Sequence, residues 1–439
     1  MPETHRGDGS SGTRGFSQTG LALAAVNNWD LRQFDVKGAY LNGYIEEEIY
    51  MRQPPGFDDG SGRVCRLKRS LYGLKQAGNV WNKELDTSLQ DLGFTRLKSD
   101  SCCYLRESDE NFEILMVWVN DIISIANNEA SNDRVEKDVG GKFEIKSLGR
   151  LTKLLGMNIR VNPNKNSISL SQTVYIDTLL KKFGLDNANP VLTPLDPNVK
   201  FDTFEKSESM DDKIVTGYAQ LIGSLMYLAI STRPDIAFAV NKLAQFSSNP
   251  KPEHWTAAKR IFRYLKGTRT HALVYGGDDL EISEDLNIFC DADWASSYDR
   301  KSTSGYVLTI AGGAVAWSAK KQATVALSTP EAEYIAATHV AKQVIWHRAL
   351  LTELGIQLPP TLTIFSDNQG ACAISHNPEF HARTKHIDIA YQFLRDLVQS
   401  GQIDVVYVNT NFNLADIFTK GLPREKHEDF SYQIGVISE

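Results

Sequence analysis

The chain has 439 residues, a formal net charge of −7, 42% hydrophobic residues and 23% charged residues. These values are typical of a soluble globular protein with two to four domains. They exclude a uniformly basic nucleic-acid binder, so affinity for phosphate must come from local patches. The five cysteines show no metal or disulfide spacing, which indicates a reducing intracellular compartment, cytoplasmic or nuclear. We expect no apolar run of transmembrane length and therefore no membrane partner.

The first part of the chain predicts a short unstructured segment followed by a domain. Residues 1–20 are rich in Gly, Ser, Thr and charge, which predicts disorder. In residues 21–160 we expect a strand at Leu31–Val36 and an apolar hairpin around Asn120-Asp121. Burying an unpaired charge costs several kcal/mol, so this polar pair is expected at the hairpin tip, facing a cleft where it can hold a cation.

The middle of the chain changes from strand to helix patterns. Residues 161–215 contain an expected strand at Ser167–Leu170, a helix at Tyr175–Phe183 and a polar linker at Asp202–Asp212. Residues 216–284 read as helices, and the last of them is amphipathic. The cations in and near this region form a candidate phosphate-binding set, for which a solvated surface is an equally good interpretation: Lys259, Arg263, Lys266, Lys320 and Lys321.

Residues 285–422 predict a mixed five-stranded sheet with flanking helices, and residues 423–439 form a C-terminal tail. Three strands in a meander come first, then a long helix over Thr329–Leu354 and two further strands at Thr361–Asp367 and Ile403–Val408. Ser328 is a good helix cap, with Glu331 placed to close a capping box. The fold class of the whole chain is therefore α/β (α+β), with several domains.

Four acidic residues of this last region stand at strand ends and in helices: Asp291, Glu333, Asp367 and Asp416. A single aspartate at a strand end is usually a turn or cap residue. Four together suit hard cations, and two Mg²⁺ or Mn²⁺ ions about 4 Å apart can support phosphodiester displacement. His386 either orients a substrate or makes a structural hydrogen bond.

Long motifs make the chain similar to a known family. The chain contains the motifs QFDVKGAYLNG at 33–43, SLYGLKQA at 70–77, RKSTSGY at 300–306, EAEYIA at 331–336 and RTKHID at 383–388. Through these motifs, the sequence from about Leu31 to Leu422 closely resembles the reverse transcriptase–ribonuclease H part of copia-type LTR retrotransposon polyproteins.

The resemblance implies roles for individual residues and regions. Asp35 matches the first catalytic aspartate of the polymerase palm, and Asn120 and Asp121 match its paired aspartates. The segment with Lys75 and Gln76 is implied to contact nucleotide and template, and Gly156 lies in the implied primer grip. The acidic quartet matches the ribonuclease H metal ligands. Residues 21–160, 161–215, 216–284 and 285–422 would be a palm with most of its fingers missing, a thumb-like region with a linker, connection helices and the ribonuclease H-like domain.

Departures from the family pattern leave three hypotheses. Asn120 removes one carboxylate from the polymerase site, Trp118 replaces a tyrosine, and Gly78-Asn79 removes a cation. The first hypothesis is divalent-metal cleavage of RNA in RNA–DNA hybrids, with an impaired polymerase. The second is a non-catalytic nucleic-acid-binding relic. The third is an active polymerase on an RNA template and DNA primer, with fingers supplied by a partner chain; other parts of the polyprotein are possible partners.

Overall fold

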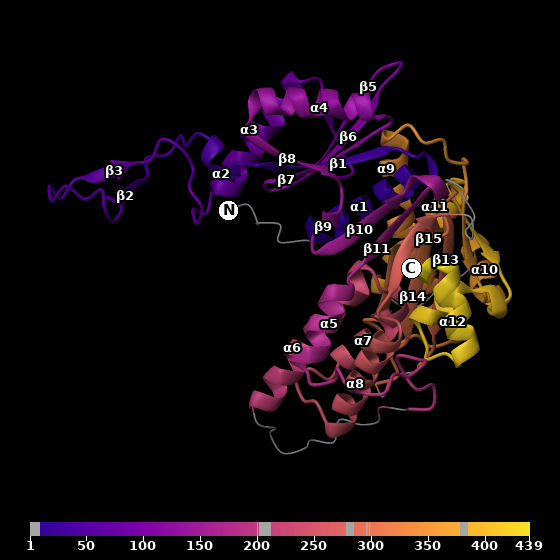
Figure 1. Cartoon of the computed structure of the whole chain (residues 1–439). Helices are drawn as coiled ribbons and strands as arrows, with labels where there is room; N and C mark the ends of the chain where they lie inside the picture. The colour runs from indigo at the N-terminus through magenta and orange to yellow at the C-terminus, as the bar shows by residue number, and fades with distance from the viewer. Residues whose placement is uncertain are drawn as a thin grey trace. The chain divides into compact units, whose positions relative to one another are not determined.

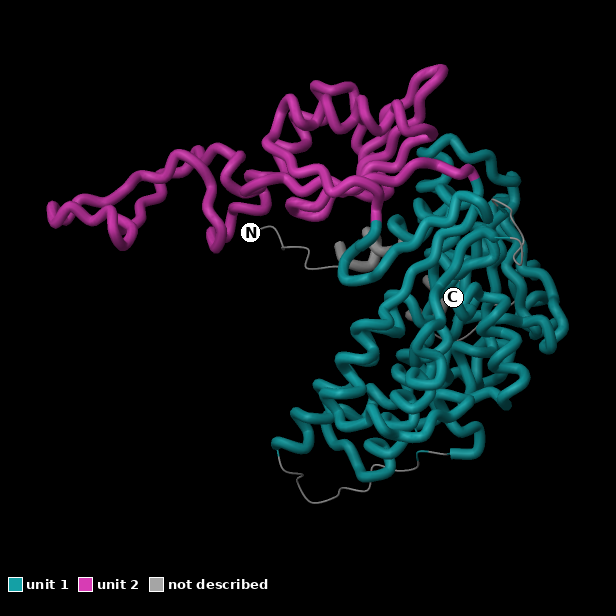
Figure 2. The backbone as a smooth tube through the Cα atoms, viewed as in Figure 1, with its two compact units in different colours: residues 1–26, 152–439 teal, residues 27–151 magenta. Residues whose placement is uncertain are grey.

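The computed structural model describes residues 9–199, 201, 212–277, 285–295, 297, 299–377 and 385–439, with the side chains of 9–15 and 385–391 excepted. The chain forms two compact units (Figure 2). Unit 2 covers residues 27–151, and unit 1 covers residues 1–26 and 152–439. Both units combine sheets and helices, which confirms the predicted α/β multidomain class.

Unit 2 contains a six-stranded antiparallel sheet with helices on one face (Figure 1). Its strands, in sheet order, are β4 (Thr95–Arg96), β5 (Cys103–Glu107), β6 (Phe112–Trp118), β7 (Asp121–Ala126), β1 (Asp30–Val36) and β8 (Ile145–Arg150). Helices α3 (Ala77–Asp91) and α4 (Glu129–Lys142) bury their apolar sides in one core with Phe34, Leu115 and Ile122. The unit also has a short helix α2 (Ala39–Asn42) and a separate hairpin of β2 (Tyr50–Arg52) and β3 (Val64–Arg66).

The first sheet of unit 1 includes the strands that directly follow unit 2 in the chain. The sheet is antiparallel throughout, in the order β18 (Val436–Ser438), β12 (His271–Gly276), β11 (Ser167–Ser171), β10 (Met157–Asn162) and β9 (Lys153–Leu154). The helices that accompany it are η1 (Pro163–Lys165), α5 (Thr173–Lys182), α6 (Asp212–Ser231), η2 (Pro234–Ile236), α7 (Ala237–Ala244) and α8 (Pro252–Gly267). The predicted strand and helix at 167–170 and 175–183 are confirmed within a few residues.

A buried ion pair joins the helical part of unit 1. The guanidinium of Arg233 and the carboxylate of Asp235 are both fully buried and lie 2.7 Å apart. Tyr264 of α8 donates a hydrogen bond to Asp235, and Arg233 also donates to the carbonyl of Thr268. Because each charge has several partners, its burial is tolerated. These contacts connect η2 to α8 and to Thr268, which follows that helix.

The second sheet of unit 1 is the predicted mixed five-stranded one. Its order is β15 (Gly313–Lys321), β14 (Thr303–Ile310), β13 (Asn287–Asp293), β16 (Leu362–Ser366) and β17 (Ile403–Tyr407). The first three strands form an antiparallel meander, and β16 pairs in parallel with both β13 and β17. The remaining elements are α9 (Thr329–Glu353), α10 (Gln369–His376), α11 (Lys385–Gln399), η3 (Thr410–Phe412), η4 (Leu414–Phe418) and α12 (Arg424–Gln433).

Helix α9 starts where its sequence predicts. The side chain of Ser328 accepts a hydrogen bond from the backbone N–H of Glu331. The Glu331 carboxylate returns to the backbone N–H of Leu327, at 2.7 Å, instead of that of Ser328. The cap is therefore confirmed, with the reciprocal bond made one residue earlier than in a standard capping box.

Four expectations differ from the structure. Disorder is wrong for residues 9–20, because helix α1 (Gly9–Val26) packs against β11, β12 and β15 and buries Phe16 and Thr19. Residues 423–439 are α12 and β18 instead of a tail. The sequence also predicts a final helix from Asn413, where the structure has the 3-10 helix η4. Helix α6 is long and apolar enough to cross a membrane by length and composition, although its buried residues include Tyr218, Leu221 and Leu225. The expected linker at 202–212 lies outside the described residues up to 211.

A glycine allows β14 and η4 to approach each other closely. A Cβ atom built at Gly305 would lie 2.7 Å from Thr419 Cγ2, 2.8 Å from Phe418 Cβ and 3.1 Å from the carbonyl oxygen of Ala415. Gly305 is also the register partner of Asp291 on β13. The absence of a side chain at this position therefore sets how near η4 lies to the centre of the sheet.

We predict that Gly305→Ala destabilises unit 1 by about 1–3 kcal/mol, because overpacking forces η4 away from the sheet. Thermal unfolding followed by circular dichroism measures the effect. Gly223→Ala is the matched control, since Gly223 lies in α6 with nothing within 4 Å of an added Cβ. An alanine there should raise helix stability by about 0.5–1 kcal/mol. Equal unfolding temperatures for Gly305→Ala and the wild type would contradict the packing argument.

Candidate metal centres

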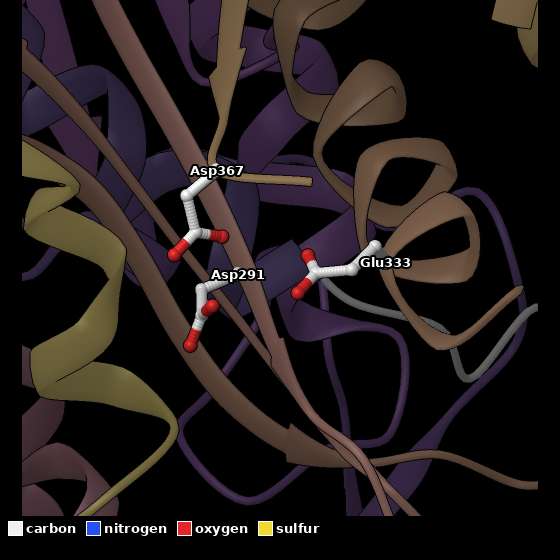
Figure 3. Close-up of side chains that lie close together, drawn as sticks. All are labelled: Asp291, Glu333 and Asp367. Carbon is white, nitrogen blue, oxygen red and sulfur yellow. The ribbon is translucent and has the colours of Figure 1, made fainter. Parts of the chain in front are cut away.

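Three acidic side chains meet at the centre of the second sheet of unit 1. Asp291, Glu333 and Asp367 each offer an oxygen atom, and these atoms all lie within 4.8 Å of one another. Figure 3 shows Glu333 and Asp367 pointing towards Asp291. Asp291 and Glu333 are buried, with 2% and 3% of their surface exposed, whereas Asp367 is half-buried. The structure thus brings three of the four predicted acidic residues together in one cluster.

Strand pairing and a small-residue contact produce this cluster. In the parallel pair of β13 and β16, Cys290 lies opposite Ser366, so the next residues, Asp291 and Asp367, lie side by side. Asp291 is inside β13, two residues before its end, instead of at the end as predicted. Helix α9 can lie close to β13 because the contact is made of small side chains. They are Ala292, Ala326, Ala332 and Ala336.

The fourth predicted member, Asp416, is buried beside the cluster and is paired with two lysines. Lys420 Nζ lies 2.7 Å from Asp416 Oδ1, and Lys426 Nζ lies 2.6 Å from Asp416 Oδ2. Lys420 also lies 3.5 Å from Asp291 Oδ2. Thr419 donates a short hydrogen bond to the same Asp291 oxygen. Sequence reasoning missed all three of these neighbours; the only signal was their position just after Asp416 in the chain.

The crowding of acidic groups changes their protonation. Burial raises the pKa of Asp291 to about 7; Lys420 opposes this shift and Asp416 adds to it. Burial, with further repulsion from Asp291 and Asp367, raises the pKa of Glu333 to about 10. Burial lowers the pKa of Lys420, but the carboxylates of Asp291 and Asp416 outweigh it and raise that pKa above its usual value. Without a divalent ion, burial and the neighbouring carboxylates therefore favour the protonated form of Glu333.

The residues of the cluster fit a hard divalent cation. All three ligands are carboxylates, which Mg²⁺ and Mn²⁺ prefer, and they come from separate elements that fix their positions. Glu333 Oε2 is buried and has no hydrogen-bond partner among the described residues. A buried acceptor without a partner is costly, and an ion at this position would satisfy it.

A separate pair of acidic residues lies at the hairpin of unit 2. Asp35, near the end of β1, lies opposite Asp121, the first residue of β7. Asn120 occupies the turn, as predicted, and its side-chain amide donates a hydrogen bond to Asp35 Oδ2. Gln33 donates to Asp121 at 3.3 Å. Burial raises the pKa of Asp121, the Gln33 hydrogen bond lowers it and the charge of Asp35 raises it.

The turn of this hairpin is held in an unusual conformation. Val119 has φ +58, which is rare for a β-branched residue. The indole N–H of Trp81, from α3, donates to the carbonyl oxygen of Val119 at 2.7 Å. The backbone N–H of Val36 donates to the carbonyl oxygen of Asn120 at 2.8 Å. These contacts fix the tip, so that Asn120 is presented to Asp35 instead of to solvent.

The predicted nucleic-acid-binding residues are spread over several elements. Lys75 is exposed, and Gln76 is the N-cap of α3, without a capping hydrogen bond from its side chain. Gly156 has φ +80 and lies against Tyr227, whose hydroxyl donates to the carbonyl of Leu155 at 2.5 Å. His386 lies in α11, and its side chain falls outside the described residues.

The basic residues of α8 serve mainly another purpose. Arg263 and Lys266 donate hydrogen bonds to the backbone carbonyls of Asn189 and Ala188, at 2.7 and 2.8 Å. Lys259 on the same helix and Lys320 on β15 are exposed, and Lys321 pairs with Asp299 at 3.0 Å. Arg263 and Lys266 thus anchor residues 188 and 189, which leaves Lys259 and Lys320 as the more accessible members of the predicted set.

Comparisons with known proteins agree with the sequence motifs. Residues 17–197 match the family described as "Reverse transcriptase (RNA-dependent DNA polymerase)". The chain is 40% identical over 428 residues to a retrovirus-related Pol polyprotein from transposon TNT 1-94 of Nicotiana tabacum, covering 96% of this chain and 32% of that one. It is 33% identical over 316 residues to a transposon Ty5-1 protein of Saccharomyces cerevisiae, covering 71% of this chain and 100% of that one.

The solved structures add little to this result. A prototype foamy virus protease–reverse transcriptase has 12% identity over 93% of this chain and 46% of its own, with a TM-score of 0.22, which is too low to support an inference. The chain spans only 32% of the tobacco polyprotein, so the relatives' full set of activities does not transfer to it directly.

The raised carboxyl pKa values predict how stability depends on pH. Asp291 and Glu333 bind protons more tightly in the folded protein than in the unfolded chain. Their protonation therefore adds to the free energy of unfolding at acidic pH. This contribution is lost as pH rises through about 7 and then about 10. In EDTA, the melting temperature of unit 1 should therefore fall from pH 5 to pH 9. Glu333→Gln should flatten this fall, whereas Glu425→Gln, at an exposed site on α12, should leave it unchanged. Parallel pH curves for all three proteins would refute the assignment.

Proposed function

The chain belongs to the reverse transcriptase family of copia-type retrotransposon Pol polyproteins, and from this premise we propose that residues 285–422 cleave RNA in RNA–DNA hybrids. The substrate is the hybrid itself, and the reaction requires Mg²⁺ or Mn²⁺, with two ions at work during cleavage. In this proposal the chain also binds an RNA template and a DNA primer. Other parts of the retrotransposon polyprotein are its protein partners.

The observation that carries this proposal is the buried cluster of Asp291, Glu333 and Asp367, with its unpartnered Glu333 oxygen. The three carboxylates face one another at the centre of the sheet, and only one lysine, Lys420, lies within ion-pair distance of any of them among the described residues. Asp416 lies beside them and completes the set of four acids. Such an arrangement destabilises the metal-free protein, and a role in holding metal explains why the chain contains it.

The protein's own residues do three things in this proposal. Asp291, Glu333 and Asp367 would hold the metal, which would supply an activated water and stabilise the leaving oxygen. The hydroxyl of Thr419 orients Asp291 by donating to one of its oxygens. Exposed cations such as Lys320 contact backbone phosphates and hold the hybrid over the site.

We predict that Asp291→Asn reduces hybrid cleavage by at least about 100-fold, because the central ligand loses its charge. A labelled RNA–DNA hybrid incubated with Mg²⁺ and the whole chain measures the rate. Asp396→Asn makes the same chemical change at an exposed position on α11 and should leave the rate unchanged. Hybrid binding without any cleavage by the wild type would favour the alternative of a non-catalytic nucleic-acid-binding relic.

We propose further that the polymerase site of unit 2 is impaired. Two carboxylates, Asp35 and Asp121, lie opposite each other, and the third position carries an amide whose N–H group points at Asp35. A neutral side chain that donates to one ligand removes negative charge and occupies an oxygen that the ion needs. The third hypothesis, an active polymerase completed by a partner, needs this site to bind two ions despite that loss.

Asn120→Asp tests this second proposal. The added carboxylate should tighten Mn²⁺ binding by unit 2 about tenfold, since ligand charge sets affinity for hard cations. Primer extension on an RNA template, weak or absent in the wild type, should increase in parallel. Asn111→Asp, also in unit 2 but away from the hairpin tip, is the control. Vigorous extension by the unmodified chain would show that Asn120 does not limit the polymerase.

A further inference from the structure

Lys420 occupies the space between two of the four acidic residues. Its ammonium group lies 2.7 Å from Asp416 Oδ1 and 3.5 Å from Asp291 Oδ2, so a single cation is shared by both carboxylates. The other oxygen of Asp416 is taken by Lys426, which also donates to the carbonyl of Thr410 at 3.1 Å. Asp416 therefore has a lysine within ion-pair distance of each of its oxygens.

The position of Lys420 is fixed by the fold. Residues 414–418 form η4, which lies against β14 because Gly305 has no side chain. Lys420 follows two residues later and is one helical turn from Asp416, which directs it back over that carboxylate. Its side chain is 37% exposed, so the ammonium group can move out to solvent without disturbing the core.

An ammonium group and a divalent ion cannot occupy this place together. Both need the oxygens of Asp291 and Asp416, and two cations a few ångströms apart repel each other strongly where water is scarce. In the cluster of Asp291, Glu333 and Asp367, Lys420 lies within ion-pair distance of Asp291 alone, and no described lysine or arginine lies that close to Glu333 or Asp367.

We propose that Lys420 is a positioning residue that holds the second ion site closed, so that divalent ions enter in a fixed order. The first ion binds at Asp291, Glu333 and Asp367. The second enters between Asp291 and Asp416 only when Lys420 leaves, and the phosphate of a bound nucleic acid, which attracts the ammonium group, promotes that step. This inference rests on the proposed nuclease function and adds an order of metal binding to it.

Calorimetric titration of the whole chain with Mn²⁺, without nucleic acid, tests the order. The wild type should bind one ion in unit 1 well before a second. Lys420→Met keeps an unbranched side chain of similar length and removes the charge, and should tighten the second binding step at least about tenfold. Lys420→Arg should restore the wild-type order, and Lys342→Met, at an exposed position on α9, should not change it. Identical titrations for Lys420→Met and the wild type would overturn the inference.

A measurement on the unmodified chain covers the case in which Lys420→Met does not fold. Acetylation of lysines by a water-soluble ester, quantified by mass spectrometry, reports whether Lys420 is held in its ion pairs. Its acetylation should rise several-fold when Mg²⁺ is increased to fill the second site, while that of Lys342 stays constant. No change at Lys420 would overturn the inference. Both readouts are independent of hybrid cleavage, so a failure of the nuclease proposal and a failure of this one can be told apart.

Discussion

The balance of charge around Asp291 is the constraint on which the second sheet of unit 1 depends. Asp291 and Glu333 are almost fully buried, with Asp367 against them, and like charges at this distance cannot all remain ionised in a site of low polarity. The protein relieves the repulsion in two ways. Lys420 lies within ion-pair distance of both Asp291 and Asp416. Burial among carboxylates favours the protonated form of Glu333 in the absence of a divalent ion. Each of these is a state that metal binding must reverse.

At the hairpin of unit 2, the repulsion between neighbouring carboxylates is relieved in a different way. There, too, strand pairing brings two aspartates face to face, since Asp35 and Asp121 are register partners. Their repulsion is relieved by side-chain amides: Asn120 donates to Asp35, and Gln33 donates to Asp121. These amide donors relieve part of the repulsion, while burial and the charge of Asp35 still raise the pKa of Asp121. In unit 1, Asp291 and Glu333 are almost fully buried, which is why the two sites support different expectations about activity.

The sequence predicted those parts of the structure that depend on local pattern. The sequence pattern indicated the five strands from β13 to β17, and the hydroxyl of Ser328 marked the start of α9. The predictions failed where tertiary contacts decide. Residues 9–20 look disordered by composition, yet Phe16 gives α1 a buried contact. The phosphate-binding role of the α8 cations stays a prediction, and the structure adds that Arg263 and Lys266 donate hydrogen bonds to backbone carbonyls. Nothing in the order of residues reveals which carbonyl or carboxylate a long side chain will reach.

The lysines around Asp416 illustrate how a packing detail becomes chemistry. Gly305 lies in β14 opposite Asp291, and its missing side chain lets the segment from Ala415 to Thr419 rest on the sheet. That approach delivers the Thr419 hydroxyl to Asp291 and leaves Lys420 one helical turn beyond Asp416. A larger residue at 305 would shift the hydroxyl, the ammonium group and the Asp416 carboxylate together, because all three are carried by one short segment. The electrostatics of the centre therefore depend on the shape of a strand that contributes no ligand.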